Sequence, residues 1–417
     1  MDLFDKFERD LGPLGKYSEL TPNYFMFPKL EGEISSRMNF MGKERIVWSV
    51  NNYLGLANHP EVRKADAEAA AEWGLAYPMG ARLMSGETKY HEQLENELAT
   101  FVNKEAGLLL NFGYQGIMSV VDALLERHDV VVYDKDCHAC IYDGIRMHIG
   151  KRLPFEHNDV DSFAKQIAKA EVLAKESKGG ILVITEGVFG MRGEQGILKE
   201  IVAYKEKYNF RLLVDDAHGF GTLGKTGAGA GEEQGVQDDI DLYFSTFAKS
   251  MASIGAFIAG DAKAIKFLRY NLRSQIFAKS LPMPLVIGNL KRLELLRSHP
   301  ELKERLWENV NMLQSGLKQH GFNIGNTNTC VTPVFLNGSV LEAAAMVQDL
   351  RDHFNIFCSA VVYPVIPKGM ILLRLIPTAV HTKADIEETI QAFAAVESKL
   401  SGGVYAEQAK ELLASIS

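Results

Sequence analysis

Short apolar runs separated by helical stretches constrain the fold of this 417-residue chain more than any other feature. Such runs lie at residues 130–133, 180–184, 211–214 and 242–244, and helical stretches such as 197–208 lie between several of them. Strands that are apolar throughout and alternate with helices are typical of parallel sheets buried on both faces. The sequence therefore predicts an α/β fold with a mostly parallel central sheet and helices on both faces.

The rest of the chain is expected to form smaller parts around this sheet. Residues 1–45 combine a short amphipathic helix with a proline-containing segment at 20–28 that favours extended structure, and we interpret them as an N-terminal arm. Later in the chain, charged amphipathic helices alternate with short apolar runs. We expect a large domain at 46–290, a smaller α+β domain at 291–400 and a tail helix at 401–417.

Composition argues against several classes of function. The net charge is −8 and no basic stripe is present, which argues against nucleic-acid binding. No apolar run approaches the roughly 20 residues that span a bilayer, and the N-terminus lacks the features of a secretory signal. We therefore expect a cytoplasmic protein, for which peripheral membrane contact stays open.

A single CxxC at Cys137 and Cys140 is only half of a zinc site, so we expect no metal.

Titratable or hydroxyl side chains follow each buried run, where the carboxyl ends of parallel strands meet at one edge of the sheet. The residues in these positions are Asp134, Asp136, His138, Thr185, Glu186, Asp215, Asp216, His218, Ser245, Thr246 and Lys249. Ligands of open α/β sheets bind at this edge. The clustering predicts a functional site there.

Lys249 is the most unusual of these residues because Phe247, Ala248 and Met251 surround it in sequence. A lysine in apolar surroundings has a lowered pKa and can act as an amine nucleophile or as the Schiff-base partner of an aldehyde cofactor. The plain alternative is a lysine that lays its stem on an apolar surface and keeps its charge in water.

Other features fit an aldehyde cofactor that carries a phosphate. A turn at residues 113–115 opens a helix. Such a turn can bind a phosphate through its backbone N–H groups, and it is equally typical of an ordinary strand–helix connection. Arg374 lies in an apolar run, where an arginine needs an anion as a partner. An amine, the Asp215 carboxylate, imidazoles, a phosphate turn and an arginine together match the needs of pyridoxal 5′-phosphate (PLP).

Motifs in a fixed order connect these residues to a known family. They occupy residues 51–56, 113–115, 136–139, 185–189, 214–218, 246–250 and 374–382. These motifs resemble those of the α-oxoamine synthases, which are fold-type I PLP enzymes. The resemblance implies an enzyme that condenses an amino acid with an acyl-CoA, releases CoA and carbon dioxide, and leaves an α-amino ketone. It also implies a homodimer with the active site at the subunit interface.

Different segments of the chain resemble two different branches of this family. Residues 246–255, 257–261, 273–277 and 306–309 look most like bacterial serine palmitoyltransferase, which implies synthesis of a sphingoid or related long-chain base, whereas 363–369 look like glycine C-acetyltransferase. An aminotransferase of the same fold and a non-catalytic binding protein are further alternatives. Comparing acetyl-CoA with palmitoyl-CoA as acyl donor separates the two branches.

The resemblance assigns catalytic roles by motif. Lys249 would form the Schiff base with the cofactor and later move protons at the substrate Cα. Asp215 would pair with the pyridine nitrogen, His218 would hydrogen-bond the ring oxygen, and His138 would stack on the ring.

The resemblance also assigns binding roles. Gly113 and Tyr114 would offer backbone N–H groups to the phosphate, Thr246 would add a hydroxyl, and Ser280 would contribute from the partner subunit. Glu186 belongs to the expected cofactor site as well. The expected substrate ligands are Asn51, Arg82 and Arg374.

The chain departs from the family pattern at four positions. Ala81, Gly190 and Ala248 stand where relatives commonly carry serine, and Glu186 stands where they commonly carry aspartate. Because Ala81 and Gly190 are expected nearer the substrate, glycine, alanine and the sulfonated amino acid cysteate are alternatives to serine.

Overall fold

The computed structural model describes residues 2–9, 11–12, 14–16 and 26–416. Most of the extended segment expected at 20–28 therefore lies outside the described residues. The chain forms two compact units, which are described separately. Unit 1 comprises Met1–Tyr53, Met191–Gly193 and Glu304–Ser417, and unit 2 comprises Leu54–Gly190 and Glu194–Lys303. The boundary that we expected near residue 290 falls inside helix α12 (Met283–Ser298).

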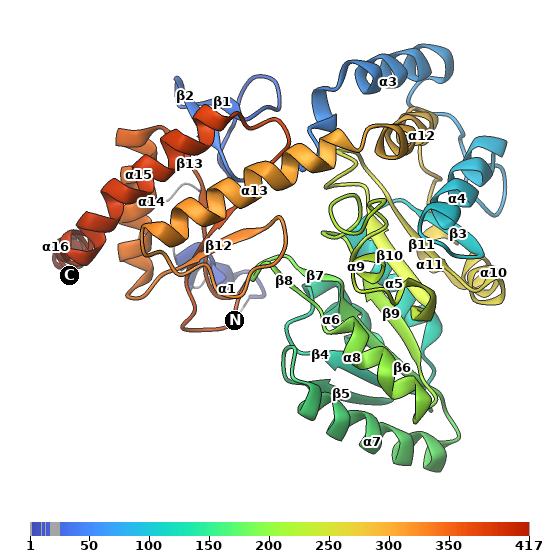
Figure 1. The fold of residues 1–417 in the computed structure, drawn as a ribbon. Coiled ribbons are helices and arrows are strands. Elements are labelled where there is room, and N and C mark those ends of the chain that lie inside the picture. The colour runs from blue at the N-terminus through green and yellow to red at the C-terminus, as the bar shows by residue number, and fades with distance from the viewer. Residues whose placement is uncertain (1, 10, 13, 17–25, 417) are drawn as a thin grey trace. The chain divides into compact units, whose positions relative to one another are not determined.

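Unit 2 is built on a seven-stranded sheet with the order β3-β11-β10-β9-β6-β4-β5 (Figure 1). Its strands are β3 (Ala106–Leu110), β4 (Val130–Asp134), β5 (Lys151–Phe155), β6 (Ile181–Glu186), β9 (Arg211–Asp215), β10 (Leu242–Thr246) and β11 (Ala256–Gly260). Strands β10, β9, β6, β4 and β5 are parallel to one another, and β11 is antiparallel to both of its neighbours. The predicted mostly parallel sheet is confirmed.

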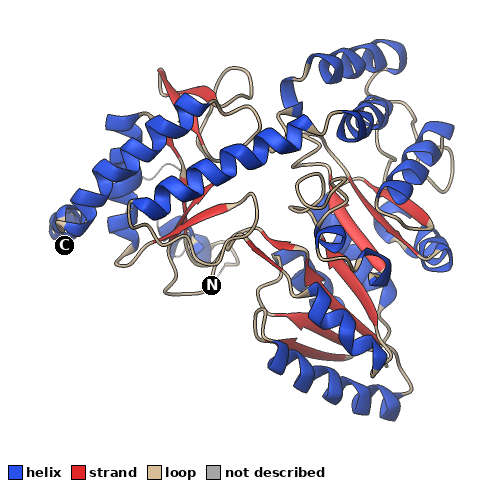
Figure 2. Cartoon of the chain, in the orientation of Figure 1, coloured by secondary structure: helices blue, strands red, loops and turns tan. Residues whose placement is uncertain are grey.

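Helices precede, connect and follow the strands of this sheet (Figure 2). The helices are α3 (Pro60–Trp73), α4 (Lys89–Phe101), α5 (Gly113–Leu124), α6 (Ala139–Met147), α7 (Val160–Ser177), α8 (Leu198–Ala203), α9 (Ala230–Glu233), α10 (Ala262–Asn271), α11 (Arg273–Ile276) and α12. A short antiparallel pair, β7 (Val188–Phe189) and β8 (Glu194–Gln195), follows β6.

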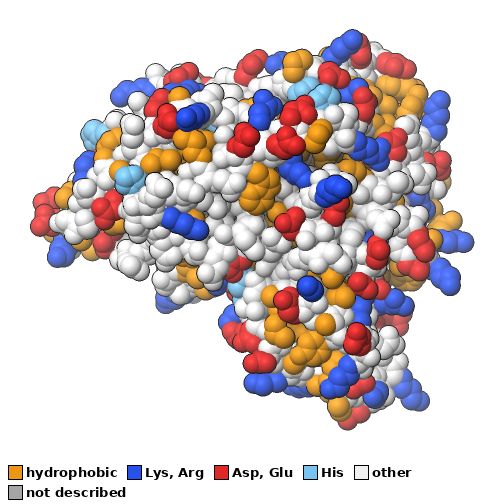
Figure 3. Space-filling view, in the orientation of Figure 1, with side chains coloured by type: hydrophobic (Ala, Val, Ile, Leu, Met, Phe, Trp, Pro, Cys, Tyr) orange, Lys and Arg blue, Asp and Glu red, His pale blue; other side chains and the backbone are white. Residues whose placement is uncertain are grey.

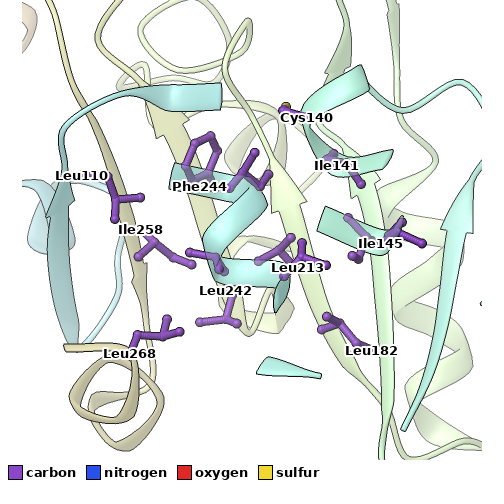
Figure 4. Close-up of a cluster of buried hydrophobic side chains, with 14 of the residues drawn as sticks. Leu110, Cys140, Ile141, Ile145, Leu182, Leu213, Leu242, Phe244, Ile258 and Leu268 are labelled. Atoms are coloured by element: carbon purple, nitrogen blue, oxygen red, sulfur yellow. The ribbon is translucent and has the colours of Figure 1, made fainter. Parts of the chain in front are cut away.

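The core of unit 2 lies on both faces of the sheet. Leu182 and Ile184 of β6 point to one face, where they join a buried cluster with side chains of α5, α6 and α10 (Figure 4). Val183 and Val214, which point to the opposite face, are also fully buried. Burial on both faces explains why these strands read as continuous apolar runs.

Unit 1 contains two small sheets and several helices. The strands are β1 (Arg37–Phe40), β2 (Lys43–Val47) and β13 (Ile356–Phe357) in one sheet, and β12 (Thr332–Phe335), β15 (Leu372–Leu375) and β14 (Ser359–Val361) in the other. The helices are α1 (Asp5–Arg9), α13 (Glu301–Gln319), α14 (Val340–Phe354), α15 (Lys383–Ser401) and α16 (Val404–Ile416). Helix α14 begins with a Ser339/Glu342 capping box, which pairs N–H groups that the first helical turn leaves open.

The surface is mixed in charge. Acidic and basic side chains are interspersed on the face shown in Figure 3, in line with the lack of a basic stripe in the sequence. None of the helices in the described part of the chain is long and apolar enough to cross a membrane. The four cysteines are buried as free thiols.

Candidate active site

Lys249 lies in the connection between β10 and β11. Phe247 and Met251 are fully buried on either side of it, while Lys249 itself is half-buried. Hydrogen bonds fix the connection: the backbone N–H of Phe247 and the hydroxyl of Thr246 both donate to the carbonyl of Gly255, at 2.9 and 3.1 Å. The lysine therefore extends from a closed turn at the carboxyl end of β10.

Asp215 ends β9, the strand next to β10. Its carboxyl is buried, and the backbone N–H of Ala217 donates to it at 3.1 Å. Burial raises the pKa of Asp215, and the positive charges of Lys249 and His138 oppose this rise. Because both charges affect the pKa of Asp215, the side chains of Lys249, His138 and Asp215 form one electrostatic group.

His138 and Glu186 complete this group. The backbone N–H of His138 donates to Glu186, which stands opposite Asp215 in the parallel register of β6 and β9. Burial lowers the pKa of His138, and the neighbouring Asp215 opposes this shift. Burial and the neighbouring Asp215 raise the pKa of Glu186 well above its ordinary value. A flat imidazole beside a buried carboxyl suits stacking on an aromatic ring.

His218 lies in the turn after β9. Its side chain is buried, and the hydroxyl of Thr222 donates to its backbone carbonyl at 2.6 Å. Gly190, which follows strand β7, lies directly against the His218 ring. This places the second imidazole at the same edge of the sheet as Asp215.

The start of α5 has the properties of a phosphate site. The helix begins at Gly113, and its N-cap residue Phe112 makes no side-chain cap, so the first N–H groups of the helix stay open among the residues that the structure describes. A Cβ placed on Gly113 would lie 3.0 Å from the hydroxyl oxygen of Thr246, which shows that these residues adjoin. The buried hydroxyl of Thr185 has no hydrogen-bond partner among the described residues. Open N–H groups next to the hydroxyl of Thr246 fit the phosphate of a cofactor such as PLP.

Tyr114 and Ser280 lie on neighbouring segments of unit 2. The ring of Tyr114 meets His138 edge-on at 6.0 Å between centroids, and its hydroxyl donates to Asp143. Ser280 donates to the carbonyl of Gly80 at 3.1 Å, within its own chain.

Arg82 is a partner in buried ion pairs of unit 2. Its guanidinium donates to Glu87 at 2.6 and 2.9 Å and to Glu95 at 2.9 Å, and Arg269 contacts the same two carboxylates. Only 6% of the Arg82 side chain is exposed. Both edges of the guanidinium are thus occupied by carboxylates of the same chain, and the expected role of Arg82 as a substrate ligand stays a prediction.

Asn51 and Arg374 are brought together in unit 1. Both terminal nitrogens of Arg374 lie 3.4 Å from Oδ1 of Asn51. The side chain of Arg374 also forms a hydrogen bond with the side chain of the buried Tyr53. The other sequence-predicted site residues belong to unit 2.

Sequence reasoning missed His157 and Glu194. The side chain of His157 contacts both Asp134 and Glu194 at the end of the sheet. His157 follows β5, an edge strand with exposed residues, and so it does not come after a continuous apolar run. The only sequence signal for this cluster is the segment 155–159, in which a histidine, an asparagine and an aspartate follow a strand.

Comparisons with known proteins show which family the chain belongs to. The family model described as aminotransferase class I and II matches residues 43–393. The chain is 65% identical to the cysteate-C-fatty acyltransferase of Capnocytophaga ochracea, over 99% of both chains. It is 33% identical to the serine palmitoyltransferase of Sphingobacterium spiritivorum, over 88% of this chain and 90% of that one. A high-resolution structure of SPT with a PLP internal aldimine matches with a TM-score of 0.88 and 30% identity, covering 96% of this chain and 100% of that one.

Proposed function

This chain belongs to the aminotransferase class I and II family and is a PLP-dependent acyltransferase of the α-oxoamine synthase type, and on that premise we propose that it condenses cysteate with a fatty acyl-CoA. The products are a sulfonated α-amino ketone, CoA and carbon dioxide. Similarity to the Capnocytophaga relative along nearly the whole chain supports cysteate over the serine expected from the branch resemblance. The product is then a sulfonated long-chain base in place of a sphingoid base.

Residues at the edge of the unit 2 sheet would hold the cofactor. PLP, when bound, supplies an electron-withdrawing ring that stabilises negative charge at the Cα of the amino acid. Asp215 would keep the ring nitrogen protonated, His138 would cover one face of the ring, and His218 would donate to the ring oxygen. Lys249 would remove and return the proton at Cα.

The phosphate and the substrate carboxylate need separate anchors. The open N–H groups of Gly113 and Tyr114, with the hydroxyl of Thr246, would hold the phosphate. Asn51 and Arg374 would hold the carboxylate of the amino acid, because a guanidinium offers two parallel donors to a carboxylate.

A homodimer is part of this proposal. Three segments of unit 2 expose large apolar side chains, and hydrogen bonds from Ser280 to Gly80 and from Asn111 to Lys279 bring these segments side by side. The exposed fractions are 75% for Met79, 82% for Met84, 58% for Phe112 and 77% for Phe277. Apolar patches of this kind favour association, and Ser280 of one subunit would then reach the phosphate site of the other.

The experiment that tests this function compares substrates directly. The PLP-loaded protein is given cysteate, serine, glycine or alanine together with palmitoyl-CoA or acetyl-CoA, and thiol release and product mass are measured. We expect cysteate with palmitoyl-CoA to react fastest and to give a product that keeps the sulfonate and has lost carbon dioxide. A faster reaction of serine with palmitoyl-CoA, or of glycine with acetyl-CoA, would contradict the proposal.

A further inference from the structure

The imidazole of His157 lies between two carboxylates in unit 2. Its Nδ1 is 3.1 and 3.2 Å from the two carboxylate oxygens of Asp134, and its Nε2 is 3.0 Å from Oε2 of Glu194. The exposed fractions of the side chains are 8% for His157, 0% for Asp134 and 19% for Glu194. Ionised carboxylates only accept hydrogen bonds, so both ring nitrogens must donate. A ring that donates to both of these carboxylates is an imidazolium.

The surrounding charges agree with this protonation. Burial alone would lower the pKa of His157, but its hydrogen bonds to Asp134 and Glu194 and the nearby charge of Asp136 raise it to about 9. The cation is thus present through the neutral pH range.

The first carboxylate shapes the turn that carries His138. Besides His157, Asp134 accepts the backbone N–H groups of Asp136 at 2.8 Å and Asn158 at 3.0 Å. His138 comes two residues after Asp136, and its own N–H donates to Glu186. The orientation of Asp134 therefore helps to define where the turn delivers the His138 ring.

The second carboxylate belongs to the β7–β8 pair. Glu194 is paired with Phe189 in this antiparallel ladder, and the Phe189 ring meets His157 edge-on at 4.4 Å between centroids. The next residue, Gly190, lies against the ring of His218. His157 is thus linked through β7 to the second histidine of the site.

We propose that His157 is a positioning residue, whose imidazolium ties the turn carrying His138 to the β7–β8 pair that packs against His218. Both histidines then keep the orientation that a bound cofactor needs. This role rests on the proposed function, because it assumes that His138 and His218 flank PLP.

Three variants separate the charge of His157 from its packing. His157→Gln leaves Asp134 and Glu194 without their shared cation, and we expect apoprotein affinity for PLP to fall about tenfold, with a shift of the visible absorbance band. Glu194→Gln alone leaves the cation with Asp134. The double variant His157→Gln/Glu194→Gln removes one buried negative charge together with the cation, and we expect it to regain much of the affinity.

His148→Gln is the matched control, because His148 is a buried histidine whose Nε2 faces a backbone carbonyl, that of Asp129, at 3.2 Å. It is expected to leave the band unchanged. If the double variant binds PLP no better than His157→Gln, then His157 acts through its packing and not through its charge, and the proposal is overturned.

Nitrogen NMR of the histidine side chains tests the imidazolium without using the cofactor. We expect both ring nitrogens of His157 to be protonated at pH 7, and a neutral ring there would overturn the proposal. A wild-type protein that binds no PLP would contradict the proposed function and this role together. A doubly protonated His157 whose replacement leaves the PLP band unchanged would contradict the positioning role alone.

Discussion

The ring of His218 occupies the space that a side chain at residue 190 would need. A Cβ on Gly190 would lie 2.1 Å from Nε2 of His218 and 2.5 Å from its Cδ2. The backbone of Gly190 is outside the left-handed region, so the space and not the backbone requires glycine here. We expected Gly190 nearer the substrate from the sequence, and the structure shows it against a proposed cofactor ligand.

Gly190→Ala should therefore act through His218. The added methyl group must displace the imidazole, and a displacement of about 1 Å can lower turnover by up to about 100-fold. We expect a shifted cofactor absorbance band as well as slower turnover. The control is Gly180→Ala, where the new Cβ would make an ordinary 3.5 Å contact with Asp129. An unchanged band in Gly190→Ala would show that the His218 ring does not touch the cofactor.

Arg82→Met should lower stability. It leaves the carboxylates of Glu87 and Glu95 with Arg269 as their remaining arginine partner, so we expect a loss of stability below the about 3–5 kcal/mol that leaving a buried charge unpaired costs. Urea unfolding measures the change. The control is Lys64→Ala in the exposed Lys64–Glu68 pair, with an expected change below about 1 kcal/mol. Unchanged stability with weaker amino-acid binding would instead support the predicted role of Arg82 as a substrate ligand.

Asp216 should make stability depend on pH. It is fully buried, its Oδ2 accepts from Ala230 and Tyr243, and burial raises its pKa to about 7. The folded state thus binds this proton more tightly than the unfolded state does. Its contribution to stability is complete below the ordinary carboxyl pKa near 3.8 and is lost as the pH rises through about 7.

Asp216→Asn is neutral at every pH and reveals this loss. Between about pH 4 and pH 8, its unfolding free energy should rise relative to wild type by on the order of 3 kcal/mol. Urea unfolding of both proteins at the two pH values gives this difference. The contributions of the other titrating groups are the same in both proteins and therefore cancel. A difference that stays constant with pH would mean that Asp216 is ionised throughout.

Met84→Asp should weaken the homodimer. A charge placed in an apolar interface loses its hydration on association, so we expect a larger monomer fraction in size-exclusion chromatography with light scattering. The control is Val172→Asp on α7, an exposed apolar position away from the three segments. A monomeric wild type, or a Met84→Asp protein that stays fully dimeric, would contradict this interface.

The sequence predicted those parts of the fold and site that depend on local pattern. Strands buried on both faces read as apolar runs, and parallel strands end at one edge, so Asp215, His138 and Lys249 could be grouped without a structure. The surroundings of Arg82 could not be predicted, because its partners Glu87 and Glu95 are shared with Arg269, far along the chain.

His157 shows the second limit of such a prediction. Strand β5 has exposed residues at its start, so its carboxyl end did not stand out as a candidate position. Its partner Glu194 lies in a strand of two residues, which leaves no periodic signal. Pairing between short or edge strands depends on tertiary contacts that one sequence does not display.

The visible absorbance spectrum of the purified protein, titrated with cysteate and with serine, tests the central claim most directly. We predict a cofactor band that is lost in Lys249→Ala and that shifts at lower concentrations of cysteate than of serine. A protein without such a band after incubation with PLP, or one whose band responds to serine before cysteate, would contradict the account.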